Sequence, residues 1–181
     1  MRKSFLYIAV IFLAGFALQA QKDTKALDEF VNSKEFRIES TWARPQATSA
    51  TNAIAGSNLQ APGSSGNRIN LIGNFNYFEM KGDSVSAYLP YYGERQFGNG
   101  HYSGDTAIEI KTIPRELVVE KNEKKGYYTI SFMADQGTET FQVNLKLFPN
   151  LKSLMTINSN QRFVINYEGK LMALKEEEPS K

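Results

Sequence analysis

The densest group of side chains that could bind a ligand follows the strand-like segment ending at Pro90. It combines two adjacent tyrosines, a charged pair beyond a glycine and a further aromatic residue, namely Tyr91, Tyr92, Glu94, Arg95 and Phe97. Paired rings at the rim of a sheet can stack on a sugar or peptide while a charged pair fixes its orientation. Alternatively, the two tyrosines cover the end of the core and the charged pair faces solvent, because buried aromatic rings usually serve packing.

His101 is the single histidine of the chain and lies in a glycine-rich segment, residues 98–105. Glycines and polar side chains together suit a mobile lid, so we count His101 among the candidate ligand-binding residues. One histidine cannot build the usual multi-histidine zinc site, and no serine sits in a Gly-x-Ser-x-Gly elbow. Nor does the Lys-Ser/Thr of a phosphate loop follow these glycines. We therefore predict no catalytic residues, no metal site and no cofactor.

Charge balance and the lack of cysteine exclude several classes of protein. Removing residues 1–20 takes Arg2 and Lys3 away from 21 basic residues and nothing from 19 acidic ones, which leaves 19 of each. A neutral protein has no field with which to gather phosphate backbones, so nucleic-acid binding is disfavoured. Without cysteine there is no thiol nucleophile and no disulfide, and apolar burial has to hold the fold together.

The N-terminal segment has the order of a secretory signal peptide. Arg2 and Lys3 precede an apolar run from Phe5 to Leu18, and small or polar residues follow. The run is shorter than the roughly 20 apolar residues of a membrane span. We predict cleavage after Ala20, a periplasmic or otherwise extracytoplasmic location, and no stable membrane span afterwards. An uncleaved anchor is the alternative.

Hydrophobic periodicity predicts one helix followed by strands. Apolar residues repeat at helical spacing over 23–33, a segment that Asp23 or Thr24 can cap. From residue 36 onward the period changes to two, as expected of half-buried strands. The expected strands are 36–42, 69–80 (with Gly73 as a bulge), 84–89, 107–113, 117–120, 127–134, 139–148, 154–158 and 162–167.

These elements predict a mostly β domain over residues 21–175, with about nine strands and one short N-terminal helix. Short turns between successive strands imply an antiparallel meander, which hides its edges by forming a barrel or a sandwich. Both architectures stay open, because both are built from short alternating strands. Residues 46–67 are predicted to form a flexible loop and 176–181 a disordered charged tail.

Several groups of residues resemble a known family. They are Trp42-Ala43-Arg44-Pro45, Leu89-Pro90-Tyr91-Tyr92-Gly93, and Ser159, Arg162 and Tyr167-Glu168-Gly169. Over nearly all of its mature length the chain resembles the Bacteroidetes periplasmic proteins grouped as domain of unknown function 4251. The resemblance implies an exported, strand-rich domain and carries no activity. It implies a turn set by Pro90 and Gly93, with Arg162 and Tyr167 pairing with backbone groups near the sheet end.

We expect an exported, non-catalytic ligand-binding module of the cell envelope, with an unknown small molecule held against the aromatic cluster after Pro90. Glu94 or Arg95 would supply polarity to that site. The alternative is a structural or assembly protein that offers a sheet edge or the 46–67 loop to an envelope partner. A hydrolase that uses His101 or a carboxylate pair has the least support.

Overall fold

The computed structural model of the protein describes residues 25–49, 52–53, 62–64, 67–96 and 107–174. A helix over residues 25–33 precedes the sheet. The strands are β1 (Glu35–Pro45), β2 (Ile69–Asn70), β3 (Tyr77–Lys81), β4 (Ser84–Pro90), β5 (Ala107–Thr112), β6 (Arg115–Asn122), β7 (Tyr127–Gln136), β8 (Glu139–Leu147), β9 (Lys152–Ser159) and β10 (Ile165–Met172). In these ranges no helix is long and apolar enough to cross a bilayer.

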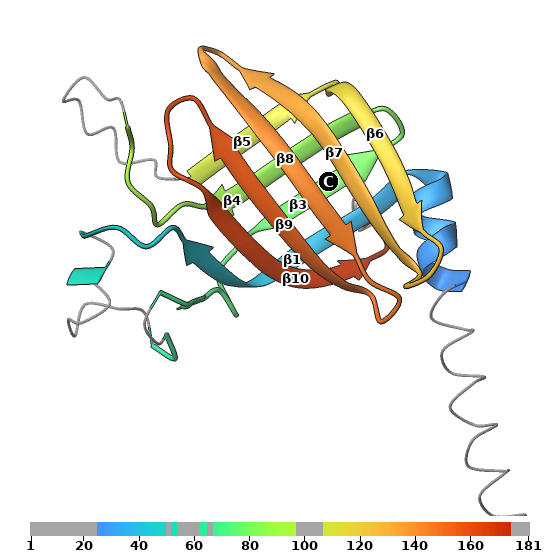
Figure 1. Ribbon diagram of the computed structural model, residues 1–181, viewed down its shortest axis with the longest axis horizontal. Coiled ribbons are helices and arrows are strands. Elements are labelled where there is room, and N and C mark those ends of the chain that lie inside the picture. Colours follow the sequence, from blue (N-terminus) through green and yellow to red (C-terminus); the bar gives the residue numbers. More distant parts are fainter. Residues whose placement is uncertain (1–24, 50–51, 54–61, 65–66, 97–106, 175–181) are drawn as a thin grey trace, which may run out of the picture.

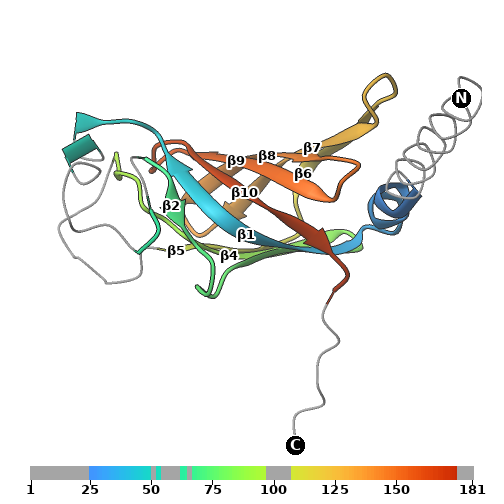
Figure 2. The same cartoon turned by 90° about the horizontal axis from the view of Figure 1, so that it is seen from below.

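The strands form one antiparallel sheet that curls into a half-barrel (Figure 1). The order is β5-β4-β3-β1-β10-β9-β8-β7-β6, and β2 pairs with β1 beside this path. Figure 2 shows the two arms of the curled sheet, with β6–β9 in one and β4 and β5 in the other, facing each other. The predicted mostly β, antiparallel architecture is confirmed. Two meanders, β3–β5 and β6–β10, are joined by β1, which lies between β3 and β10.

Apolar side chains from both arms fill the space between them. β7 and β8 bury alternate residues along their length, as the period of two predicts. Large rings dominate this core, among them Phe36, Phe78, Phe132, Phe141 and Tyr167. The rings of Phe78 in β3 and Phe132 in β7 are stacked with their centroids 6.1 Å apart, so aromatic packing connects one arm to the other.

The helix packs beside β6 and β7, where it covers one end of the core (Figure 1). Its apolar face carries Leu27, Phe30 and Val31. Asp28 accepts hydrogen bonds from Lys121 Nζ at 2.8 Å and Tyr128 Oη at 2.7 Å, and the bond from Lys121 lowers the pKa of this carboxyl. The predicted helix is confirmed from residue 25 onward, and Asp23 and Thr24 lie outside the described residues.

The predicted single strand over 69–80 is wrong. The chain forms β2, turns over residues 71–76 and then continues as β3. Gly73 adopts a φ of +85°, a conformation that favours glycine. This backbone conformation is not extended, so the strand ends before it. Asn76 then binds both backbone groups of Ser40, at 2.8 and 3.0 Å, so side-chain hydrogen bonds replace a stretch of the ladder.

Other predicted boundaries also change. The last strand begins at Ile165 rather than at residue 162, and Arg162 contributes only an isolated bridge with Arg95. The hairpin between β3 and β4 turns at Gly82, in the gap between the predicted strands 69–80 and 84–89. Most of the predicted 46–67 loop, and all of the 176–181 tail, lie outside the described residues.

Candidate functional site: a cationic groove on the outer face

The predicted aromatic cluster lies where β4 ends, against the segment that leads into β10. Tyr91 is buried, with 5% of its surface exposed, and its Oη hydrogen-bonds the carbonyls of Glu94 (2.7 Å) and Phe163 (3.1 Å). Burial raises the pKa of this phenol to about 12. Gly93 permits the contact, because a Cβ there would lie 2.4 Å from the Tyr91 Oη. Tyr91 therefore holds two segments of the chain together.

The other members of the predicted cluster have different surroundings. Tyr92 keeps 36% of its surface exposed, and the burial of the rest raises its pKa. Glu94 accepts a hydrogen bond from Thr48 Oγ1 at 2.7 Å, and Arg95 forms a backbone bridge with Arg162. Phe97 of the cluster lies outside the described residues, as does the separate candidate His101. Solvent thus reaches only the second tyrosine of the pair, and ligand contact at this cluster stays a prediction.

A different charged cluster forms on the outer face of β1 and β10. Glu168 of β10 stands opposite Trp42 of β1 in the strand register. Its carboxylate pairs with Arg44 at 2.8 Å and with Arg68 at 3.0 Å. The Arg68 guanidinium also lies 4.0 Å from the centre of the Trp42 ring, a cation–π arrangement. These contacts hold Arg68 over the sheet in a fixed position.

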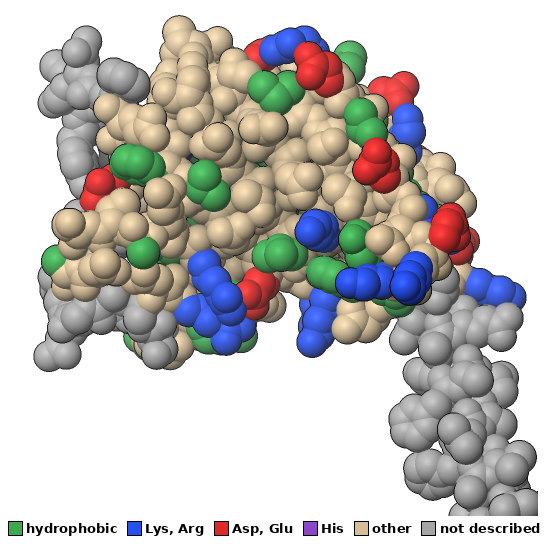
Figure 3. Space-filling view, in the orientation of Figure 1, with side chains coloured by type: hydrophobic (Ala, Val, Ile, Leu, Met, Phe, Trp, Pro, Cys, Tyr) green, Lys and Arg blue, Asp and Glu red, His purple; other side chains and the backbone are tan. Residues whose placement is uncertain are grey.

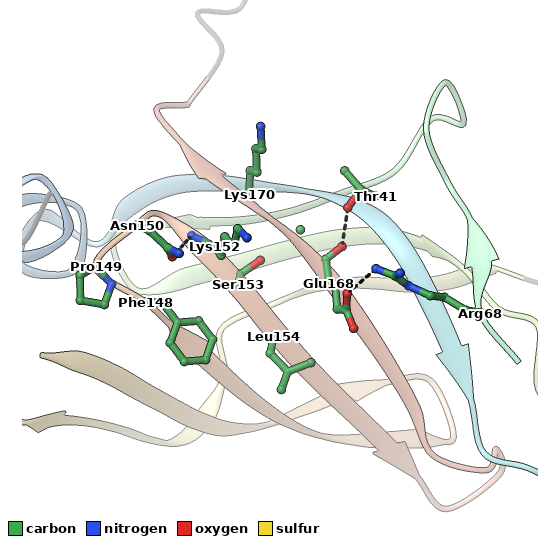
Figure 4. Close-up of a pocket in the computed structure, with 11 residues that line it drawn as sticks. Thr41, Arg68, Phe148, Pro149, Asn150, Lys152, Ser153, Leu154, Glu168 and Lys170 are labelled. Atoms are coloured by element: carbon green, nitrogen blue, oxygen red, sulfur yellow. Dashed lines mark hydrogen bonds and ion pairs between the residues drawn. The ribbon is translucent and has the colours of Figure 1, made fainter. Parts of the chain in front are cut away.

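Beside this cluster, a groove of about 620 Å³ crosses the outer face of β9, β10 and β1 (Figure 4). Its lining includes the three cations Arg68, Lys152 and Lys170 and a single carboxylate, Glu168. Apolar residues line the end near the β8–β9 turn, namely Phe148, Pro149 and Leu154. Figure 3 shows basic side chains gathered over the lower part of the molecule, where β1 and β10 run in Figure 1.

The two lysines of the groove stand directly opposite each other. Lys152 in β9 and Lys170 in β10 are register partners, and both side chains are exposed. Neither ammonium forms an ion pair with a described residue. Like charges directly opposite each other on neighbouring strands destabilise a sheet, so an anion between them would relieve repulsion. The carboxylate of Glu168 is already paired with two arginines.

Two buried polar atoms of residues that line the groove have no hydrogen-bond partner within the described structure, the Nε of Arg68 and the Oγ of Ser153. Successive side chains of a strand point to opposite faces, so Ser153, which is only 3% exposed, points to the inner face of the sheet, away from the side chain of Lys152. Buried polar atoms are nearly always hydrogen-bonded in folded proteins, so the Nε of Arg68 is suited to meet a bound molecule. The neighbour of Ser153 across the ladder is Gly169, which has no side chain to satisfy the hydroxyl. A Cβ at Gly169 would lie 2.4 Å from the Glu39 carbonyl oxygen, which explains the glycine.

The donor groups of the groove suit an anion. Its donors are ammonium, guanidinium and hydroxyl groups, all of which suit carboxylate, phosphate or sulfate oxygens. Among the described residues, its lining contains one carboxylate and no histidine. Across the described ranges, no three His, Cys, Asp or Glu side chains gather in a way that could hold a metal ion.

Comparison with known proteins assigns the chain to a family. A family model described as a domain of unknown function, DUF4251, matches residues 18–171. The chain belongs to the DUF4251 family. A crystal structure of a DUF4251 family protein from Bacteroides eggerthii aligns with a TM-score of 0.55 at 13% identity, over 85% of this chain and 87% of that chain. At this identity the likeness concerns the fold alone. Curated proteins give no match.

Membership of the DUF4251 family confirms the resemblance seen in the sequence, and the structure shows what its marked residues contact. Tyr167 is buried, and its Oη donates to the Pro90 carbonyl at 2.8 Å, the kind of backbone pairing that the resemblance implied. Arg162 donates through Nε to the carboxylate of Glu139 at 3.0 Å. Tyr167 therefore joins β10 to the end of β4, and Arg162 joins the segment before β10 to the start of β8.

Sequence reasoning missed the groove because its residues are distant in the chain. Lys152, Lys170 and Arg68 each read as an ordinary exposed charge on a strand or loop. Their proximity depends on the register of β9 with β10 and on the position of β1. A usable signal was Glu168 within the family motif, since a carboxylate marked together with Trp42 and Arg44 suggests a charged cluster. That signal leads to the edge of the groove but not to its lysines.

Proposed function

We propose that the protein is an exported, non-catalytic binding module of the cell envelope that holds an anionic small molecule in the groove across β9, β10 and β1. The observation that carries this proposal is the facing pair Lys152 and Lys170, which lacks a described counter-charge and shares the groove with the unpartnered Nε of Arg68. Phe148 and Leu154 add apolar surface for the remainder of such a ligand. The site thus differs from the tyrosine cluster that the sequence suggested.

Nuclear magnetic resonance titration with phenyl phosphate tests the binding site. We expect the largest backbone amide shifts around Lys152–Leu154 and Glu168–Lys170, and weaker binding as salt rises, because the contacts are between charges. Lys152→Gln combined with Lys170→Gln should weaken binding at least about tenfold, since two charge-assisted contacts are lost.

The matched control is Lys111→Gln, which removes the same charge from an exposed position on β5 and should leave the affinity unchanged. Phenol provides a second control, because it keeps the ring without the charge. Equal affinity of phenyl phosphate for the wild-type protein and the Lys152/Lys170 variant would contradict the proposed site.

Export is tested separately by mass spectrometry of the protein recovered from a periplasmic extract. The charged start and the apolar run of residues 5–18 support removal of a signal peptide. We expect the mass of a chain that begins at Gln21. A full-length chain found only in the cytoplasmic fraction would contradict the envelope location.

A further inference from the structure

A second hollow adjoins the groove. It has a volume of about 420 Å³ and lies between the outer face of β1 and the turn at residues 71–76. Thr41 lines both hollows, so together they form one trench that runs from the β8–β9 turn, across β9, β10 and β1, to the 71–76 turn. We call this combined surface the trench.

The two ends of the trench are apolar. At the 71–76 turn, Ile72 and Phe75 expose 69% and 68% of their surfaces. The Phe75 ring is supported from behind by two tyrosines, with centroids 5.6 Å from Tyr77 and 5.5 Å from Tyr88, so it is a firm platform rather than a loose side chain. The opposite end carries the apolar residues of the β8–β9 turn, Phe148 and Pro149.

The middle of the trench is polar and favours negative charge. Lys152 and Lys170 face each other there, with Arg68 at one side. The charged residues of the second hollow are paired with each other, because Arg37 Nε donates to Glu39 at 3.2 Å and its guanidinium also pairs with Glu79. The excess positive charge therefore sits at the centre, between two apolar ends.

The length of the trench fits a short extended segment. It spans the spacings from β9 to β10, to β1 and on to the turn, which is about 14 Å at roughly 4.8 Å per spacing. An extended chain rises by about 3.3 Å per residue, so about four residues would cover this distance.

We propose that the trench binds an extended acidic peptide segment with an apolar residue at each end. This inference rests on the proposed function and specifies its ligand class: acidic side chains would meet Lys152 and Lys170, while the flanking apolar side chains would contact Phe75 at one end and Phe148 at the other. A single-tailed anionic lipid matches the surface less well, because it offers only one apolar end.

Fluorescence anisotropy with labelled Leu-Glu-Glu-Phe amide tests the proposal, with inorganic phosphate and phenyl phosphate as small-anion competitors. We expect saturable binding that is lost for Leu-Lys-Lys-Phe amide and weakened for Ser-Glu-Glu-Ser amide. Ile72→Ser combined with Phe75→Ser should weaken the acidic peptide about tenfold and leave phenyl phosphate binding unchanged, because only the peptide reaches that end. Ile113→Ser is the matched control, since this residue is equally exposed, at 72%, and lies outside the trench.

The outcomes separate this inference from the proposed function. If phenyl phosphate binds at the lysines but the peptide is insensitive to the Ile72/Phe75 variant, the peptide proposal is wrong and the anion site stands. If neither probe binds, both fail. If dodecyl phosphate binds with sensitivity to the Ile72/Phe75 variant while the peptide does not, the occupant is an anionic lipid and the peptide proposal is overturned.

Discussion

Replacing Arg162 with alanine is expected to lower the free energy of unfolding by about 3–5 kcal/mol, because it leaves a buried carboxylate without its counter-charge. Arg162 and Glu139 are 5% and 9% exposed. The Arg162 Nε lies 3.0 and 3.3 Å from the two carboxylate oxygens, and Ser159 Oγ donates to one of them at 2.6 Å. The guanidinium also lies 5.1 Å from the centre of the Tyr91 ring. Urea unfolding followed by far-ultraviolet circular dichroism measures the loss.

The control removes both charges at once. Arg162→Met combined with Glu139→Leu should recover much of the stability lost in Arg162→Ala, since apolar replacement of a whole buried pair is often neutral or stabilising. If Arg162→Ala cost less than about 1 kcal/mol, the pair would behave like an exposed salt bridge, contrary to its burial.

Replacing Phe78 with alanine should cost a similar amount, about 3–5 kcal/mol, through the cavity left in the core. Phe78 is 1% exposed and lies between two other rings, with centroids 6.1 Å from Phe132 and 6.3 Å from Phe36. The first contact joins the two arms of the half-barrel, so the arms would lose contact area at their centre. The same urea measurement applies.

Phe75→Ala is the matched control for this prediction. It removes the same side chain from the 71–76 turn that precedes β3, at a residue that is 68% exposed. We expect a change within about 0.5–1 kcal/mol, as for most surface substitutions. Comparable losses for Phe75→Ala and Phe78→Ala would show that the proposed division between core and surface is incorrect.

Local periodicity predicted the strands well where one face is buried and the other is open. β7, β8 and β9 bury every second residue over most of their length, so the pattern in the sequence maps directly onto the two faces. The same reasoning failed at 69–80, where Asn76 binds the backbone of Ser40. The two residues are 36 positions apart in the chain, and no local sequence pattern predicts this contact.

The candidate site was harder to predict for a related reason. The cluster after Pro90 was visible because its residues are close together in the chain. Adjacency does not reveal that Tyr91 turns inward, where its Oη hydrogen-bonds the carbonyls of Glu94 and of the distant Phe163. For Tyr91 the structure agrees with the alternative in which the tyrosines cover the end of the core. The groove depends on facing lysines whose pairing is set by the register of β9 and β10, a tertiary property.

The central position of β1 has a consequence for the order of folding. In β1, Arg37 pairs with Met172, so the first described strand closes its ladder only when the last one is present. During synthesis the N-terminal part of the chain emerges first, and β1 must wait with one edge unpaired until β10 becomes available. Contacts between such distant positions are slow to form, because a long loop has to close before they can stabilise anything. We therefore expect truncation before β10 to leave the β1–β3–β4–β5 arm without an independent fold.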